Sequence, residues 1–332
     1  MIHQRVLKAV LITACSALSL CMAITVSAQE RSADWPSKPV KLIVPFGPGS
    51  TPDILARLVG DKLSSTLKQA FVIENRAGAG GNIGTHAVAR ATPDGYTIGV
   101  SITGPLVNNS VLYSKLPYDP FKDLLPVTLA AIQPNVLAVA STLGVKNADE
   151  FFKLLRANPG KYNYASVGAG TVSHLSMEMI KSKAGVYIVH IPYAASPAAV
   201  TSVLSGDTQM ASLAPAALIP QIKAGKLVAI AVTTEQRYPA MPQVPTFKEI
   251  GVPDVIATAW IGIVVPAQTP ADLVLRINQA FVAALKDPVV VEKLQAQHME
   301  TVGNSPQQFA AFMQQELKRW SPIIKRTGVT LD

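Results

Sequence analysis

The sequence is poor in cysteine, in charge and in long apolar runs. Both of its cysteines, Cys15 and Cys21, lie near the N-terminus, so a disulfide scaffold is excluded for the rest of the chain. Charged residues make up 15% of the chain, and the basic ones form no cluster that would indicate a nucleic-acid groove. Beyond residue 28 no apolar stretch is long and uninterrupted enough to span a bilayer. We therefore expect a soluble globular protein that does not bind nucleic acid.

The usual signatures of catalysis are also missing. The chain has no G-x-S-x-G motif, no H-E-x-x-H motif and no cysteine nucleophile after residue 28. Only five histidines occur, and His3 lies in the N-terminal segment. We expect no enzymatic activity, no bound metal and no cofactor. The one alternative is a hydrolytic pair of Ser166 and His174, which are eight residues apart across a loop and could approach each other.

The N-terminal segment has the pattern of an export signal. Arg5 and Lys8 precede an uncharged apolar stretch that ends in Val26-Ser27-Ala28. Small residues at this spacing suit signal peptidase, so the pattern predicts a signal peptide over residues 1–28 and cleavage after Ala28. An uncleaved anchor and a lipid anchor at Cys15 are the alternatives.

From residue 40 onward, short β-rich runs alternate with helical patterns. This alternation predicts parallel βαβ units in doubly wound α/β sheets, and 332 residues suit two such domains. Expected strands cover residues 40–44, 71–74, 97–101, 135–140, 162–166, 187–190, 209–213, 228–232 and 262–265. Expected helices cover residues 52–68, 148–157, 173–184, 198–205, 270–286 and 306–326.

One strand-to-helix turn, residues 44–53, combines glycine, proline and hydroxyl side chains. Ser50 or Thr51 can cap the helix, and Pro52 suits its first position. The unpaired amide groups of the first helical turn favour an anion. Asp53 would repel an anion, so it either caps the backbone or contacts a polar or cationic end of a ligand.

A second turn, residues 164–175, has the same strand–glycine–hydroxyl–helix order. It resembles the start of a dinucleotide fingerprint, but Ser173 replaces the third glycine and no acidic residue follows at the required distance. His174 either orients this loop or contacts a ligand. Two more turns, residues 76–84 and 190–197, are also rich in small residues and poor in lysine and arginine. Neutral donors of this kind favour a small carboxylate over a polyphosphate.

Motifs along almost the whole chain beyond residue 34 resemble one family. They include Trp35-Pro36, Pro45-Phe46, the run from Glu74 to Gly84, Pro93-Asp94-Gly95-Tyr96, Tyr118-Asp119-Pro120, Pro126-Val127, His190-Ile191-Pro192-Tyr193, Ala224-Gly225-Lys226-Leu227 and Trp260-x-Gly262. The chain resembles the extracytoplasmic solute receptors of tripartite tricarboxylate transporters, the Bug or TctC-like proteins.

The resemblance implies two doubly wound α/β domains around a cleft, the type II periplasmic binding protein or Venus-flytrap architecture. Domain 1 would cover residues 29–135 and 257–332, and domain 2 residues 136–256. It further implies a monomer in the periplasm that binds a dicarboxylate, an amino acid or an aromatic carboxylate for membrane permease subunits. A sensor that presents its ligand to a membrane signalling partner is the alternative. Carried over by position, the ligand-binding residues are Pro48, Ser50, Thr51, Asp53, Ser166, Gly168, Gly170, Thr171 and His174. We also expect Phe46, Ala195 and Ser196, from the first and the fourth of these turns, to contact the ligand.

The chain departs from the family pattern in two places. Ser50 stands where the family usually has the second glycine of a pair, and Ala194-Ala195 stand where Lys-Gly is usual. Ser50 adds a side chain where the backbone would approach a ligand closely. Ala195 would be strained if its position required a positive φ. The sequence therefore predicts an altered ligand geometry at these two positions.

Overall fold

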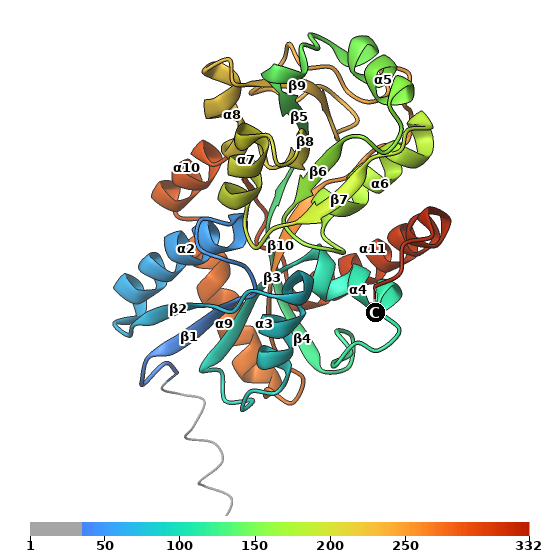
Figure 1. Cartoon of the computed structure of the whole chain (residues 1–332). Helices are drawn as coiled ribbons and strands as arrows, with labels where there is room; N and C mark the ends of the chain where they lie inside the picture. Colours follow the sequence, from blue (N-terminus) through green and yellow to red (C-terminus); the bar gives the residue numbers. More distant parts are fainter. Residues whose placement is uncertain (1–34, 332) are drawn as a thin grey trace, which may run out of the picture.

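The computed structural model describes residues 35–331. The predicted signal peptide, its cleavage site and the two cysteines lie outside these residues. Two separate sheets, each covered by helices, form two lobes with a continuous chain passing between them (Figure 1). Among the described residues, no helix has the length and apolar character needed to cross a membrane.

The first sheet has six strands in the order β11-β4-β10-β3-β1-β2. Its strands β1, β2 and β3 are parallel, whereas β10 runs antiparallel to both β3 and β4. Two segments of the chain form this lobe. The segment that ends with β4 contains helices α2, α3 and α4, and the segment that begins with β10 contains helices α9, α10 and α11. The bounds are β1 Val40–Val44, α2 Thr51–Leu67, β2 Phe71–Asn75, α3 Asn82–Ala89, β3 Thr97–Ile102, α4 Asn109–Leu112, β4 Leu124–Gln133, β10 Ala259–Pro266, α9 Ala271–Leu285, α10 Pro288–Ala296, β11 Glu300–Thr301 and α11 Pro306–Thr327.

The second sheet has five strands in the order β7-β6-β8-β5-β9. The strand β6 is parallel to β7 and β8, and β5 is antiparallel to β8 and β9. The bounds are β5 Val136–Ala140, α5 Ala148–Ala157, β6 Asn163–Ser166, α6 Val172–Ala184, β7 Val189–Pro192, α7 Ser196–Ser205, β8 Met210–Leu213, α8 Pro215–Lys223 and β9 Leu227–Val232. The predicted α/β fold class is confirmed, although both sheets are mixed rather than purely parallel.

The chain passes between the lobes through two antiparallel strand pairs, β4 with β10 and β5 with β9. The strand β4 ends at Gln133 and β5 begins at Val136, and the return path leads from β9 to β10. Thr233 ties the two crossings together. Its hydroxyl donates to the Ala257 carbonyl at 2.7 Å and accepts the Asn135 amide at 3.0 Å. These bonds fix the chain at the junction of the two lobes.

The ten-residue strand β4 was not predicted from the sequence. A proline inside an apolar run argues against a central strand, because proline cannot donate a ladder hydrogen bond. Here Pro126 pairs with Val264 directly beside a register shift in the β4–β10 ladder, where a strand tolerates the lost donor. The prediction failed because the tertiary pairing that accommodates Pro126 is not visible in the local sequence.

Helix α11 packs against both lobes. Its first half buries Phe309 and Met313 in the apolar cluster that contains Trp260 of β10. Its second half buries Trp320 and Ile324 in the core of the second lobe. The predicted apolar stripe of this helix is present, and it divides between two cores. The proposed domain boundary at residue 257 thus leaves a helix that is shared by both domains.

Candidate ligand-binding site

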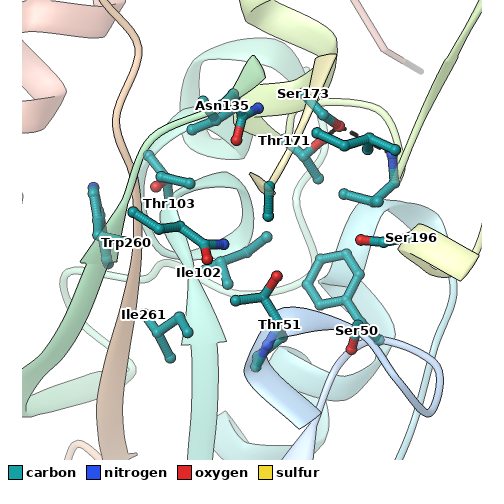
Figure 2. Close-up of a pocket in the computed structure, with 18 residues that line it drawn as sticks. Ser50, Thr51, Ile102, Thr103, Asn135, Thr171, Ser173, Ser196, Trp260 and Ile261 are labelled. Atoms are coloured by element: carbon teal, nitrogen blue, oxygen red, sulfur yellow. Dashed lines mark hydrogen bonds between the residues drawn. The ribbon is translucent and has the colours of Figure 1, made fainter. Parts of the chain in front are cut away.

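A cavity lies between the two lobes, at the ends of strands and the beginnings of helices (Figure 2). The volume of this cavity is about 50 Å³. The first lobe contributes the start of α2, the end of β3 and the start of β10. The second lobe contributes the starts of α6 and α7 and the end of β8. A guest in this cavity would therefore contact both lobes at once.

Three helices begin at the cavity wall. The wall includes Thr51 from α2, Val172 from α6 and Ser196 from α7. The first amide groups of a helix have no acceptor within the helix, and the helix dipole places partial positive charge there. Figure 2 shows the hydroxyl oxygens of Thr51 and Ser196 pointing into the space between the labelled residues. Helix starts from both lobes thus supply donors for an anionic group.

Three buried polar atoms on this wall have no hydrogen-bond partner. They are the Ser50 Oγ, the Thr103 Oγ1 and the Gln133 Oε1. These residues are only 2%, 1% and 6% exposed. Buried polar atoms in proteins almost always have partners, because an unsatisfied one costs about 1–3 kcal/mol. Their convergence on one cavity indicates that a guest molecule or ordered water completes these bonds.

The cavity wall is electrically neutral. None of its 18 lining residues, all within the described part of the chain, carries a charge. Trp260, Ile102 and Ile261 form an apolar side, and Asn135 and Gln133 add amide groups (Figure 2). Asn135 is fixed in place because its Nδ2 donates to the Ser212 carbonyl at 3.2 Å. The site resembles the usual small-molecule pocket, which is mainly apolar with a few placed polar groups.

Five of the residues proposed from the sequence line this cavity, and seven do not. The first set is Phe46, Ser50, Thr51, Thr171 and Ser196. The second set is Pro48, Asp53, Ser166, Gly168, Gly170, His174 and Ala195. Thr103, Gln133 and Asn135 were not predicted as site residues, because they lie next to strand ends and in a crossing segment without a recognisable motif. Trp260 belongs to the Trp260-x-Gly262 motif, which was not assigned to the site.

Asp53 does not line the cavity but stabilises the loop before α2. It is 2% exposed and accepts from the Gly49 amide at 2.9 Å, from Arg57 and from Asn75. Burial raises the pKa of Asp53, but the hydrogen bonds from Arg57, Gly49 and Asn75 outweigh it, and the net pKa is lowered. Of the two alternatives for this residue, the structure shows the backbone-capping one.

The loop from residue 166 to 174 is held by its own polar side chains. The Ser166 Oγ lies 2.6 Å from the His190 Nε2 and accepts the Gly168 amide at 3.1 Å. His174 uses its Nδ1 to accept the Gly170 amide at 3.1 Å. The alternative of a Ser166–His174 hydrolytic pair was therefore wrong about the partner. Ser166 is fully buried and bonded to His190, so it is not presented to a substrate.

Thr171 also acts within this loop. Its hydroxyl donates to the Gly168 carbonyl at 2.6 Å and lies 2.9 Å from the Ser173 Oγ. Because Ser173 in turn accepts the Val167 amide, the beginning of α6 is closed into a rigid turn. The Thr171 side chain lines the cavity while its hydroxyl is occupied by the loop. The beginning of α6 at the cavity wall is thereby held in one conformation.

Neither departure from the family pattern strains the backbone. Ala195 has an extended conformation with φ −161° and ψ 161°, and Ser50 has φ −71°. The expected penalty for a side chain at Ala195 does not arise, because that position needs no positive φ. The lobes touch beside it, where the Gly47 amide donates to the Ala194 carbonyl at 3.1 Å.

Two stacked histidines lie behind the loop. The rings of His174 and His190 are 4.1 Å apart between centroids, and Tyr164 stacks on His190. Burial and the charge of Lys181 lower the pKa of His174 to about 4. Burial, followed by the neighbouring His174, lowers the pKa of His190 to about 3. Both rings are therefore neutral at pH 7.

This stack predicts a loss of stability in acid. The unfolded chain, with an ordinary histidine pKa of about 6.5, binds more protons than the folded chain between pH 6.5 and the lowered values. The stabilisation is full above pH 6.5 and falls as the pH drops, with His190 alone contributing about 2.5 kcal/mol between pH 7 and pH 4.5. Urea unfolding at pH 7 and pH 4.5 gives the change in the free energy of unfolding between these two pH values. This change should be clearly smaller in His190→Gln than in the unsubstituted protein. In the control His86→Gln, outside the stack, it should be as large as in the unsubstituted protein; an equal reduction in both variants would contradict the prediction.

Comparison with known proteins shows the family of the chain. The model of the family described as "Tripartite tricarboxylate transporter family receptor" matches residues 55–329. Protein BugT of Bordetella pertussis is 34% identical over 302 residues, covering 90% of this chain and 93% of BugT.

Two solved structures are also close in sequence and shape. One is R. palustris Rpa4515 with adipate, which is 34% identical with a TM-score of 0.85 and covers 89% of this chain and 99% of that one. The other is MatC from Rhodopseudomonas palustris with bound malate, which is 30% identical with a TM-score of 0.83 and covers 87% of this chain and 100% of that one. The resemblance inferred from the sequence motifs is confirmed. The chain belongs to the family of tripartite tricarboxylate transporter receptors.

Proposed function

We propose that this chain captures a small organic carboxylate in the cavity between its lobes and delivers it to the membrane permease subunits of a tripartite tricarboxylate-type transporter. The observation that carries the proposal is the set of three unpartnered buried polar atoms on Ser50, Thr103 and Gln133, residues that all line a cavity at which three helices begin. The bound adipate and malate of the two similar structures support a carboxylate as the guest. Capture takes place in the periplasm, after cleavage near Ala28.

The cavity can hold a carboxylate without a basic side chain. The amide groups at the starts of α2, α6 and α7 have fixed positions and need no reorganisation when the anion arrives. The hydroxyls of Thr51 and Ser196 add neutral donors from opposite lobes. Because the anion bonds to both lobes, it binds the closed arrangement better than the open one and shifts the population toward closure.

A screen by thermal shift tests the proposal directly. Protein freed of bound ligand should melt at a higher temperature in the presence of at least one acid from a panel that includes malate, hexanedioate, amino acids and benzoate. Stabilisation follows from binding to the folded state alone, and it grows with ligand concentration above Kd. Failure of every acid to raise the melting temperature would contradict the proposed function.

A pair of matched substitutions tests the cavity itself. Thr103→Val removes an unpartnered buried hydroxyl, so the free energy of unfolding of the ligand-free protein should stay unchanged or rise by about 1 kcal/mol. The affinity for the acid found in the screen should fall about five- to tenfold, as measured by isothermal titration calorimetry.

Thr128→Val is the control for Thr103→Val. Thr128 is equally buried, but its hydroxyl donates to the Asn304 carbonyl at 2.8 Å, away from the cavity. This substitution should lower the free energy of unfolding by about 1–2 kcal/mol and leave the affinity unchanged. If Thr103→Val behaved like Thr128→Val, the hydroxyl of Thr103 would have no part in binding.

A further inference from the structure

A second, larger cavity adjoins the first. We call it the outer chamber; it lies among the start of α2, helices α7 and α8, and the segment after α10 that contains Gln297 and Met299. Its volume is about 370 Å³. In Figure 1 these four helices gather on one side of the molecule, where the two lobes meet. The outer chamber and the inner cavity share four wall residues, namely Thr51, Gln133, Ser196 and Ala214.

The wall of the outer chamber is apolar and uncharged. Ile54, Val200, Leu204 and Met299 are its large apolar residues, and the polar side chains on it are hydroxyls and amides. Leu204 is 40% exposed, so a large apolar side chain borders the chamber without being covered by the protein. Neither a lysine, an arginine nor an acidic residue is among the described residues of this wall. A charged group in the chamber would find no counter-charge on this wall.

Gln133 stands between the two spaces. It lines both cavities, it is 6% exposed, and its Oε1 has no partner. Thr51 and Ser196, whose hydroxyls point into the inner cavity in Figure 2, stand at the same junction. A guest that passes from one cavity to the other therefore crosses a ring of neutral hydrogen-bonding groups and then meets apolar walls.

We infer that the ligand is a monocarboxylate whose carboxylate occupies the inner cavity and whose uncharged, largely apolar body extends past Gln133 into the outer chamber. This inference rests on the proposed function and names the class of acid. The small inner cavity is suited to the carboxylate and the first few carbons, and the chamber, which has the size and apolar character of a ligand pocket, suits the remainder. Because α2 and Met299 belong to one lobe and α7 and α8 to the other, the body of the acid also holds the lobes together.

Calorimetric titration with butanoate, hexanoate and octanoate tests the inference. Burial of each added methylene should strengthen binding about three- to fourfold, so that Kd falls steadily from butanoate to octanoate. Leu204→Asp and Thr201→Asp place a carboxylate in the chamber at exposed positions, where folding is not at risk. Each should weaken octanoate at least tenfold and leave butanoate within twofold of the unsubstituted protein.

The control is Leu275→Asp, at a position on α9 that is 47% exposed and does not line either cavity. It should change neither titration. A Kd that stays constant from butanoate to octanoate would contradict the inference that the acid extends into the chamber. An equal loss of affinity for both acids in Leu204→Asp would contradict it too. Neither result would contradict the receptor function. Binding of malate or hexanedioate without binding of any monocarboxylate would have the same consequence. If no acid of any class binds, the proposed function itself is overturned.

Discussion

Gly80→Ala should weaken binding of the acid found in the screen about 100-fold while the protein remains folded. Gly80 lies in the loop before α3, in the first lobe, and has φ +62°. A Cβ on this residue would lie 2.3 Å from the carbonyl oxygen of Ala169 in the second lobe, closer than any real contact. Because the obstacle is backbone, it cannot rotate away, and the lobes must separate. A ligand then keeps the bonds of one lobe only, which corresponds to a loss of about 2.7 kcal/mol.

The control for the backbone conformation is Gly144→Ala. Gly144 has φ +71°, and a Cβ there would meet nothing within 4 Å. It should lower the free energy of unfolding by about 1 kcal/mol, as Gly80→Ala also should, but leave the affinity unchanged. Small-angle X-ray scattering gives an independent readout, since saturating ligand should no longer compact the Gly80→Ala protein. Retention of normal affinity by Gly80→Ala would show that the closed contact between residues 80 and 169 is not needed for binding.

The sequence predicted the helix starts of the site well, because local chemistry determines them. Glycine, a hydroxyl residue and proline in residues 47–52 specify a turn and a helix beginning, and Ser50 and Thr51 do lie at the cavity. The loop around Thr171 was identified for the same reason. In that loop, however, the hydroxyls of Ser166 and Thr171 are used to fix the turn. Sequence alone could not show which donors remain free, because partners such as His190 come from another strand.

The other side of the cavity could not be predicted, because topology rather than local pattern assembles it. Thr103 directly follows β3, Gln133 ends β4 and Asn135 lies in the crossing, so each stands where the chain leaves the first sheet. No spacing rule relates these three positions. They meet because β10 pairs between β3 and β4, an arrangement that depends on the missed strand β4. A prediction that omits this strand also omits the amide groups at its end.

Glu316→Leu, at a buried position of α11, should lower the free energy of unfolding by about 3–5 kcal/mol. Glu316 is 5% exposed, and its Oε2 accepts the indole N–H groups of both Trp260 and Trp320 at 3.0 Å. Its Oε1 pairs with Arg319 at 3.0 Å. Removing the carboxylate leaves two buried indole donors without an acceptor and a partly buried guanidinium without its counter-charge. Urea denaturation of the ligand-free protein measures the effect.

Two further variants separate the buried network from a general effect of losing an acidic residue. Glu316→Gln keeps an oxygen for the indoles but loses the charge opposite Arg319, so its cost should be intermediate, about 1–2 kcal/mol. Glu292→Leu, at an exposed position of α10, should stay within about 0.5 kcal/mol of the unsubstituted protein. A loss below 1 kcal/mol for Glu316→Leu would show that the indoles find other acceptors.

The effect of Glu316 should extend to the binding site, because the residue connects it to the rest of the fold. Trp260 lines the inner cavity and Trp320 lies in the core of the second lobe. Arg319 additionally donates to the Ile256 carbonyl at 2.6 Å, in the segment through which the chain returns to the first lobe. The carboxylate of Glu316, together with Arg319, thus connects the cavity wall, helix α11 and the crossing segment. We therefore expect Glu316→Leu to weaken binding of the acid as well, whereas Glu292→Leu should bind it normally.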